Sequence, residues 1–511
     1  MNALRTSRTA LLAALVAAGS AAAQLPLSVD TTFRAGLPSQ NVYSVLPLAD
    51  GKVIISGQLQ FSDLPNQRAG ARLLPNGLRD PSFNQGFLPM GGKLTAWSNK
   101  YYSGNGQGLR RFLMNGSIDT DFNFIGQWQQ ISALQGGDYH VYSDGSVLLG
   151  GYYDIIDPAH GYYQGVGYNL AWITAEGRLD TTRTHRTGNG AVFGIKEYPA
   201  GTAGGLGGKF LVHQWGTQYE GQPVSKVIRV HADGSLDNSF NAPIPWGYIY
   251  DMLPLPDGRA YIAGEFRLEN GNDTIQLVRL MPDGSLDPAF NNDLAFEIDT
   301  AHLSNSAGVL DVLDLGNGLL ALAGDFSSVD GHIRGGLCII DTTGAVVTHY
   351  LEGAGCGNYD YQLGLMTITY GVISGIARAP SGDYYIWGAY HGYSDGTTND
   401  TLQRMVTRLH GGEIGLGVVE GERAKPGLRL SIKPNPANAW VVFTCDLPDL
   451  SGEAQLIVRD MMGREAWRAS ISRGNGQVLM DTSGLPAGAY VAELLQEGQR
   501  LLPAERLIVQ P

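Results

Sequence analysis

Short apolar segments alternate with glycine-containing turns along most of the chain. Five of them follow a turn and end in a small residue: ADGKVIISG from Ala49, SDGSVLLGG from Ser143, PDGRAYIAG from Pro256, GNGLLALAG from Gly316 and SGDYYIWG from Ser381. Asp-Gly and Asn-Gly suit tight turns between antiparallel strands, because both residues can adopt the left-handed conformation. The pattern therefore predicts many short strands joined in hairpins, rather than helices.

A second phrase recurs at longer range. VHADGSLDNSF at Val230–Phe240 returns as RLMPDGSLDPAF at Arg279–Phe290, and alignment on the turn gives seven copies. Their turn glycines lie about 56 residues apart on average, which is in the range of one four-stranded propeller blade. The sequence thus predicts an all-β fold, a β-propeller of about seven four-stranded blades. The turn glycines are Gly77, Gly116, Gly177, Gly234, Gly284, Gly344 and Gly412.

Most copies end in an Asp-x-x-Phe tail, as at Asp237–Phe240 and Asp287–Phe290. The aspartate can accept hydrogen bonds from the amides that follow it, and the phenylalanine can fill the seam between neighbouring sheets. The last copy lacks this tail, whereas LSVDTTF at Leu27–Phe33 is a tail without a copy before it. We therefore expect the N-terminal segment to complete the last blade and close the ring.

The DG turn followed by SLDxxF resembles the bacterial delta-60 repeat family, over residues 28–413. Membership would imply a propeller-like repeat architecture in a secreted protein. It would imply no reaction, because such repeats have no catalytic residues to carry over.

The N-terminus has the pattern of a secretory signal peptide. Arg5 and Arg8 precede an apolar run, and small residues lead to a cleavage site between Ala23 and Gln24. No later stretch reaches the roughly 18 apolar residues of a membrane-spanning helix. We expect residues 1–23 to be removed, the repeat region to occupy residues 24–413, and no transmembrane anchor.

The pattern changes after a glycine-rich linker at residues 414–427. Residues 428–511 show short alternating strands with Pro, Asn and Gly turns, which predicts a small β-sandwich. This segment resembles the C-terminal sorting domain of the type IX secretion system, which implies Sec export to the periplasm, recognition by the outer-membrane translocon, and release or attachment at the cell surface. An ordinary terminal sandwich is the alternative. The matching residues are Pro434, Asn435, Pro436, Asp460, Gly463, Leu485, Pro486, Gly488 and Tyr490.

Composition excludes some classes of function. The net charge is −13 and Lys and Arg form no cluster, so a nucleic-acid-binding surface is not expected. With three cysteines, at most one disulfide can form, and Cys338 with Cys356 is the candidate pair. The ten histidines show no metal-ligand spacing, and no nucleophile or phosphate-binding motif occurs, so we predict no metal, no cofactor and no catalytic residue. Carboxylate pairs such as Asp311 and Asp314 cannot be shown to converge from spacing within one chain.

Aromatic residues in irregular segments are the candidate ligand-binding residues, because Tyr and Trp combine a flat apolar face with a polar tip. The alternative is that they pack long loops onto the propeller. We predict a secreted or cell-surface, non-catalytic binding protein with the propeller as a display platform. Its partners would be the type IX machinery and an extracellular glycan or protein; a polymer-degrading hydrolase or lyase and a structural surface component are the alternatives. The candidate ligand-binding residues are Tyr152, Tyr153, Trp246, Tyr248, Tyr390 and Tyr393.

Overall fold

The computed structural model divides the chain into two compact units, residues 1–414 and 415–511. The predicted signal peptide with its cleavage site at Ala23 and Gln24, and most of the predicted linker, lie outside the described residues. The structure describes residues 25–83, 92–105, 108–124, 130–269, 271–299, 306–363, 366–412, 414, 429–446, 453–460, 464–471, 476–496, 499–501 and 505–510.

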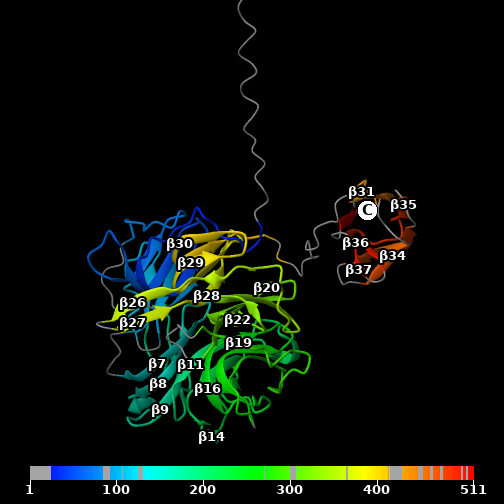
Figure 1. Ribbon diagram of the computed structural model, residues 1–511. Coiled ribbons are helices and arrows are strands. Elements are labelled where there is room, and N and C mark those ends of the chain that lie inside the picture. Colours follow the sequence, from blue (N-terminus) through cyan, green and yellow to red (C-terminus); the bar gives the residue numbers. More distant parts are fainter. Residues whose placement is uncertain are drawn as a thin grey trace, which may run out of the picture. The chain divides into compact units, whose positions relative to one another are not determined.

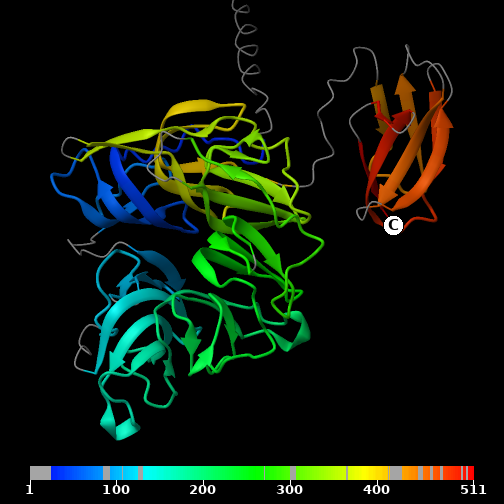
Figure 2. The same ribbon diagram turned by 60° about the horizontal axis from the view of Figure 1, so that its bottom comes forward.

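The first unit is a β-propeller. Its sheets follow one another in chain order, and the yellow strands β29 and β30 lie beside the blue N-terminal sheet, so the described residues form a ring of seven blades (Figures 1 and 2). Each sheet is antiparallel, as the hairpin turns require. The three principal strands of the blades are β1 (Ser39–Pro47), β2 (Val53–Gln60) and β3 (Arg68–Leu73); β4 (Lys93–Trp97), β5 (Lys100–Gly104) and β6 (Arg110–Leu113); β7 (Ile131–Val141), β8 (Val147–Ile155) and β9 (Gly167–Ile173); β11 (Val192–Glu197), β12 (Phe210–Gln214) and β15 (Val227–Val230); β16 (Trp246–Pro254), β17 (Ala260–Arg267) and β18 (Ile275–Leu280); β20 (Gly308–Gly316), β21 (Leu319–Asp325) and β24 (Leu337–Asp341); and β28 (Val372–Arg378), β29 (Tyr384–Ser394) and β30 (Asn399–Leu409).

The chain forms short additional strands between these principal strands, and among the described residues single turns of 3-10 helix occur at Pro158–His160 and Ala203–Gly205. Within the described residues, no helix has the length and apolarity needed to cross a bilayer. The additional strands are β10 (Arg186–Thr187), β13 (Gln218–Tyr219), β14 (Gln222–Pro223), β19 (Phe296–Glu297), β22 (Ser328–Val329), β23 (His332–Ile333), β25 (Gly355–Cys356), β26 (Tyr359–Leu363) and β27 (Met366–Tyr370).

The tail of each repeat adds a fourth, minimal strand to its sheet. After the DG turn the chain folds back, so that Leu280 of β18 bridges Leu286 and Asp287 N–H donates to Arg279 O at 2.8 Å. In the last blade Val29 bridges Leu409 of β30, and Asp30 N–H donates to Arg408 O at 2.9 Å. The N-terminal segment therefore completes the last blade, which confirms the predicted closure.

An arginine and an aspartate join each regular blade to the next. The arginine Nε donates to the tail aspartate of the same blade at 2.5–2.9 Å. Its guanidinium group lies 4.9–5.2 Å from the ring centre of the tail phenylalanine. Its Nη1 donates to a backbone carbonyl in the DG turn of the following blade. The aspartate also accepts the amide two residues on, as the sequence predicted. We call this arrangement the brace. Its aspartate–arginine pairs are Asp30–Arg408, Asp80–Arg72, Asp119–Arg111, Asp237–Arg229 and Asp287–Arg279.

The third and sixth blades depart from this rule. Trp172 takes the arginine position of the third blade, opposite Asp180, and Arg183 lies over its ring. In the sixth blade Val347 N–H donates to Ile339 O, so an apolar pair stands where the others have Asp and Arg. The seam after the sixth blade is thus held by apolar packing alone at this position.

The core of the propeller lies between consecutive sheets rather than at its centre. Between the sixth and seventh blades, for example, Ile339 and Leu319 pack against Ile373 and Ile386. Burial of these alternating faces is the main stabilisation, at about 25 cal/mol per Å² of apolar surface.

Cys338 and Cys356 are both free thiols, so the predicted disulfide does not form. The reason is the alternation of side chains along β24. Cys338 faces the seam toward the fifth blade, whereas its neighbours Leu337 and Ile339 face the seam toward the seventh, where Cys356 packs. The two thiols therefore lie on opposite faces of one sheet.

The second unit contains two antiparallel sheets. Alternate residues such as Val441, Leu456, Ala492 and Leu507 are fully buried and form its own core. This arrangement is the predicted small β-sandwich. One sheet has the order β31-β32-β35 and the other has β34-β33-β36 with β37 and β38 paired to β36: β31 (Arg429–Lys433), β32 (Trp440–Asp446), β33 (Ala454–Asp460), β34 (Glu465–Ile471), β35 (Gly476–Asp481), β36 (Gly488–Gln496), β37 (Gln499–Arg500) and β38 (Glu505–Val509).

Candidate functional site

The innermost strands of the blades share an irregularity that shapes the central channel. In β1, β11, β16, β20 and β28 one extra residue bulges out of register with the second strand. A bulge re-aims the side chains beside it. In β16 the bulge lies between Ile249 and Asp251, and in β20 between Val309 and Asp311.

The residue after the bulge connects its blade to the next. Asp251 Oδ2 accepts Val312 N–H at 3.0 Å, and Asp311 Oδ2 accepts Ile376 N–H at 2.8 Å. Asp138 of β7 accepts Ile195 N–H at 3.0 Å in the same way. Each carboxyl thus uses one oxygen as an inter-blade link and leaves the other for the channel.

These side chains line a cavity of about 440 Å³ to which all seven blades contribute. Lys196 Nζ lies 2.5 Å from Asp251 Oδ1, and Lys93 Nζ lies 2.9 Å from Asp138 Oδ1. The Lys196 side chain keeps 40% of its surface accessible, because it faces this cavity rather than a packed core. The channel is therefore a polar, charged chamber.

Asp311 is the unusual group of this chamber. Burial and the negative charge of Asp251, with which it shares a hydrogen bond, together raise the pKa of its carboxyl to about 8, although the charge of Lys196 and the hydrogen bond from Ile376 N–H oppose this rise. Burial would lower the pKa of Lys196, but the negative charge of Asp251, which also accepts a hydrogen bond from the lysine, outweighs that effect and raises it. At neutral pH Asp311 therefore favours its protonated form, beside the charged Lys196.

A row of exposed aromatic side chains leads along β16 to the chamber. We call Trp215, Trp246, Tyr248 and Tyr250 the aromatic row; each is 42–52% exposed. The ring centres of Trp215 and Tyr248 are 4.9 Å apart, and Tyr248 and Tyr250 are stacked at 6.5 Å with 7° between their planes. Tyr250 also lines the chamber, so the row and the chamber are continuous.

The sequence identified only part of this surface. Trp246 and Tyr248 lie in the aromatic row, but Tyr153, Tyr390 and Tyr393 are at most 1% exposed. Tyr153 donates to Gly150 O at 2.8 Å and Tyr390 to Thr407 Oγ1 at 2.8 Å, so these rings pack the core and are not accessible to a ligand. Tyr152 is partly buried with its ring against Gly167. These four residues therefore follow the alternative interpretation, in which aromatic side chains pack the propeller instead of binding a ligand.

Sequence reasoning missed the chamber, although a signal for it exists. Asp138, Asp251 and Asp311 each stand seven residues before the glycine of the following hairpin turn, namely Gly145, Gly258 and Gly318. Asp311 and Asp314, whose convergence spacing alone could not show, do not form a pair: Asp314 is exposed and accepts Gly316 N–H of its own turn at 2.8 Å. Asp311 instead meets Asp251 and Lys196 from two other blades.

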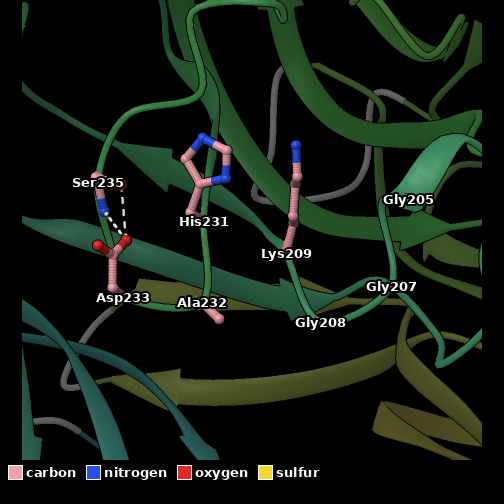
Figure 3. Close-up of a pocket in the computed structure, with 8 residues that line it drawn as sticks. All are labelled: Gly205, Gly207, Gly208, Lys209, His231, Ala232, Asp233 and Ser235. Atoms are coloured by element: carbon pink, nitrogen blue, oxygen red, sulfur yellow. Dashed lines mark hydrogen bonds between the residues drawn. The ribbon is translucent and has the colours of Figure 1, made fainter.

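A second, open pocket lies on the fourth blade, between the glycine loop at Gly205–Gly208 and the DG turn. Figure 3 shows Lys209 and His231 side by side above it, and Asp233 bound to Ser235. Lys209 Nζ is 2.8 Å from Asp237 Oδ2, so its charge belongs to the brace. The polar groups of this pocket thus serve the repeat, and the chamber is the better candidate.

In the second unit, the residues of the predicted sorting signal are structural contacts. Asn435 Nδ2 donates to Arg506 O at 2.6 Å and its Oδ1 accepts Ile508 N–H at 2.9 Å, which fixes the last strand beside the Pro434–Pro436 turn. Tyr490 donates to Pro486 O at 2.8 Å, near Leu485 and Gly488, and Asp460 binds Arg464 at 2.8 Å. Gly463 lies outside the described residues.

Comparison with known proteins agrees with the fold. A family model described as a β-propeller domain of unknown function (DUF5122) matches residues 48–83, 208–240 and 255–290. The repeat region is a β-propeller. No curated protein matches the chain.

Several solved structures are similar to the chain at low identity. A protein of unknown function from Bacteroides caccae is 13% identical, with a TM-score of 0.28, covering 66% of this chain and 98% of its own. BamB from Moraxella catarrhalis is 10% identical, with a TM-score of 0.29, covering 74% of this chain and 85% of its own. A protein of unknown function from Bacteroides thetaiotaomicron VPI-5482 is 10% identical, with a TM-score of 0.28, covering 75% of this chain and 74% of its own.

Proposed function

We propose that this chain is a secreted or cell-surface binding protein whose propeller holds an extracellular glycan on the aromatic row. The observation that carries this proposal is the continuous path from Trp215 over Tyr248 to Tyr250, in which each ring is more than two fifths exposed. Large aromatic side chains are usually buried, and an exposed cluster of them marks an interaction surface.

The geometry of the row suits a sugar chain. Flat rings offer apolar faces to the C–H faces of sugar rings, while phenol and indole groups can bind hydroxyls. Tyr250 donates to Glu265 Oε1 at 3.2 Å, and Arg267 lies 4.9 Å from the ring centre of Trp246, so two members of the row have fixed neighbours. Such fixed aromatic groups lose little conformational freedom when they bind.

The C-terminal unit supports a surface location. Its resemblance to type IX sorting domains includes the Pro434–Pro436 turn, which Asn435 ties to the last strand. These two hydrogen bonds of Asn435 hold the turn and the last strand together in one folded unit. We propose that the secretion machinery recognises this unit after Sec export. Deletion of residues 428–511 should then leave the propeller in the periplasm; equal amounts of intact and shortened protein in the culture medium would refute this address.

One observation favours an enzyme as the second candidate. Asp251 and Asp311 are neighbouring carboxyls, and the pKa of Asp311 is raised to about 8 by burial and by the charge of Asp251, which suits a general acid. A hydrolase or lyase would release new reducing ends from a bound polysaccharide, whereas a binding protein would not.

Binding to a glycan array with three variants tests the proposal. Tyr248→Ala and Trp215→Ala each remove a central ring of the row, and a ring of this kind contributes about 2 kcal/mol, or roughly thirtyfold in affinity. Tyr163→Ala is the matched control, because Tyr163 is 57% exposed on the third blade, outside the row. The proposal fails if the intact protein binds no glycan, or if the row variants bind as well as the control.

A further inference from the structure

The charged side chains that line the chamber do not balance. They comprise three carboxyls, Asp138, Asp251 and Asp311, but only two ammonium groups, Lys93 and Lys196. Each lysine has its own carboxylate, at 2.9 and 2.5 Å. Among the described residues, no salt bridge joins Asp311 to a cation.

The third carboxyl is held in place by the fold. Its Oδ2 accepts Ile376 N–H at 2.8 Å, and Asp251, which would otherwise repel it, is fixed by Val312 N–H at 3.0 Å. Asp311 therefore cannot turn away from the chamber without breaking an inter-blade link. One negative charge must be neutralised there, either by a proton or by a cation that enters.

The chamber fits an organic cation better than a metal ion. In the part of the chain that the structure describes, no three His, Cys, Asp or Glu side chains are arranged to hold a metal. The cavity of about 440 Å³ has room for a sugar-sized group, and Tyr43, Phe193 and Tyr250 contribute aromatic rings to its wall. Aromatic faces attract ammonium groups, and do so more strongly where water is excluded.

We propose that the chamber binds the ammonium group of an amino sugar, with Asp311 as its carboxylate partner. This inference rests on the proposed function, because the glycan would reach the chamber along the aromatic row. Tyr250 belongs to both surfaces, so a sugar stacked on Tyr248 places its neighbour at the chamber. The class of ligand is therefore a glycan that carries unacetylated amino groups.

Binding would exchange one cation for another. In the free protein Asp311 carries a proton, and when the ammonium group enters, that proton leaves to solvent and the carboxylate forms a charge-assisted hydrogen bond. The charged groups around Asp311 are Asp251 on β16, Lys196 on β11, Asp138 on β7 and Lys93 on β4. Each lysine stays paired with its own carboxylate, so the exchange should involve one proton, that of Asp311.

The test compares two tetrasaccharides by calorimetry, one of glucosamine and one of N-acetylglucosamine. At pH 5.5, where the free amines of the sugar are protonated, we expect the glucosamine form to bind at least tenfold more tightly, with release of about one proton, measured by repeating the titration in buffers of different ionisation enthalpy. Between pH 4.5 and 5.5 its affinity should rise by nearly tenfold per pH unit, while that of the acetylated form stays constant.

Two variants assign the effect to Asp311. Asp311→Asn keeps an oxygen for Ile376 N–H but cannot become negative, so it should abolish the preference for the amine, the proton release and the pH slope. Asp314→Asn is the matched control, because it removes an exposed carboxylate from the same strand. If Asp311→Asn fails to fold, the proton count of the unaltered protein still decides the question.

The outcomes separate the two proposals. Equal binding of both sugars, or an amine preference that survives Asp311→Asn, overturns the inference but leaves glycan binding intact. An amine preference without proton release also overturns it. Binding of neither sugar, together with an empty glycan array, overturns both.

Discussion

Replacing Asp30 with valine should weaken the closing seam of the propeller. Asp30 accepts Thr32 N–H at 2.8 Å, Thr32 Oγ1–H at 2.6 Å and Arg408 Nε–H at 2.7 Å. Valine removes all three bonds and leaves the guanidinium of Arg408 paired only with neutral oxygens such as Pro75 O, at 2.9 Å. The side chains of Arg408 and Asp30 are only 15% and 8% exposed.

The cost follows from the charge that stays behind. Removal of one partner from a buried ion pair costs about 3–5 kcal/mol, because the other charge remains without compensation. Arg408 keeps some contact with water, so we expect the lower end, about 3 kcal/mol.

Comparison with the sixth blade gives a second prediction for the Asp30–Arg408 pair. There Ile339 and Val347 occupy the positions of Arg408 and Asp30, and the blade folds with an apolar pair. The double variant Asp30→Val with Arg408→Ile copies this pair, and it should cost less than Asp30→Val alone although it removes more bonds. An isosteric apolar pair is often close to neutral where a lone charge is not.

Urea unfolding followed by tryptophan fluorescence, with refolding as a check of reversibility, measures these differences. Asp63→Asn is the control, since it breaks an exposed pair with Arg79 and should have little effect. The reasoning is refuted if Asp30→Val is as stable as the control, or if the double variant is less stable than the single one by more than the error of the measurement.

Three further predictions concern titratable groups. Burial alone would raise the pKa of each brace aspartate, but hydrogen bonds from the arginine and from the turn outweigh it and lower the pKa, with a lysine added at Asp119 and Asp237. The stabilisation by these aspartates is present above the unfolded pKa of about 4 and should be lost as the pH falls below it. Unfolding measured at pH 2–6 would show this loss, and a flat profile would contradict it. The pKa of Asp311 is raised instead, so the contribution of this residue to the stability of the folded protein falls as the pH rises from about 4 to 8. Asp311→Asn should therefore be more stable than the unaltered protein at pH 8 but not at pH 4. Cys338 is fully buried, and burial raises the pKa of its thiol to about 12. It should therefore resist alkylation in the folded protein and react only when the protein unfolds. Mass spectrometry of labelled peptides measures this, and rapid labelling of the folded protein would contradict it.

Local patterns determined the fold of the repeat region. The spacing of the turn glycines and the unpaired tail at Leu27–Phe33 were sufficient to predict seven blades and the closing strand, because hairpin turns and alternation depend on neighbours in the chain. The tail aspartate was also interpreted correctly as a turn acceptor, since its partner amide is two residues away.

Tertiary structure alone decided which residues form the chamber. Asp251, Asp311 and Lys196 come from three blades, and only closure of the ring brings them to one cavity, where burial and mutual charge set their protonation. It also decided that Tyr390 and Tyr393 are buried while Tyr248 is exposed, and that Cys338 faces away from Cys356. Sequence fixes how a residue relates to its own strand, but the charge, exposure and partners of a side chain depend on which other strands pack against it.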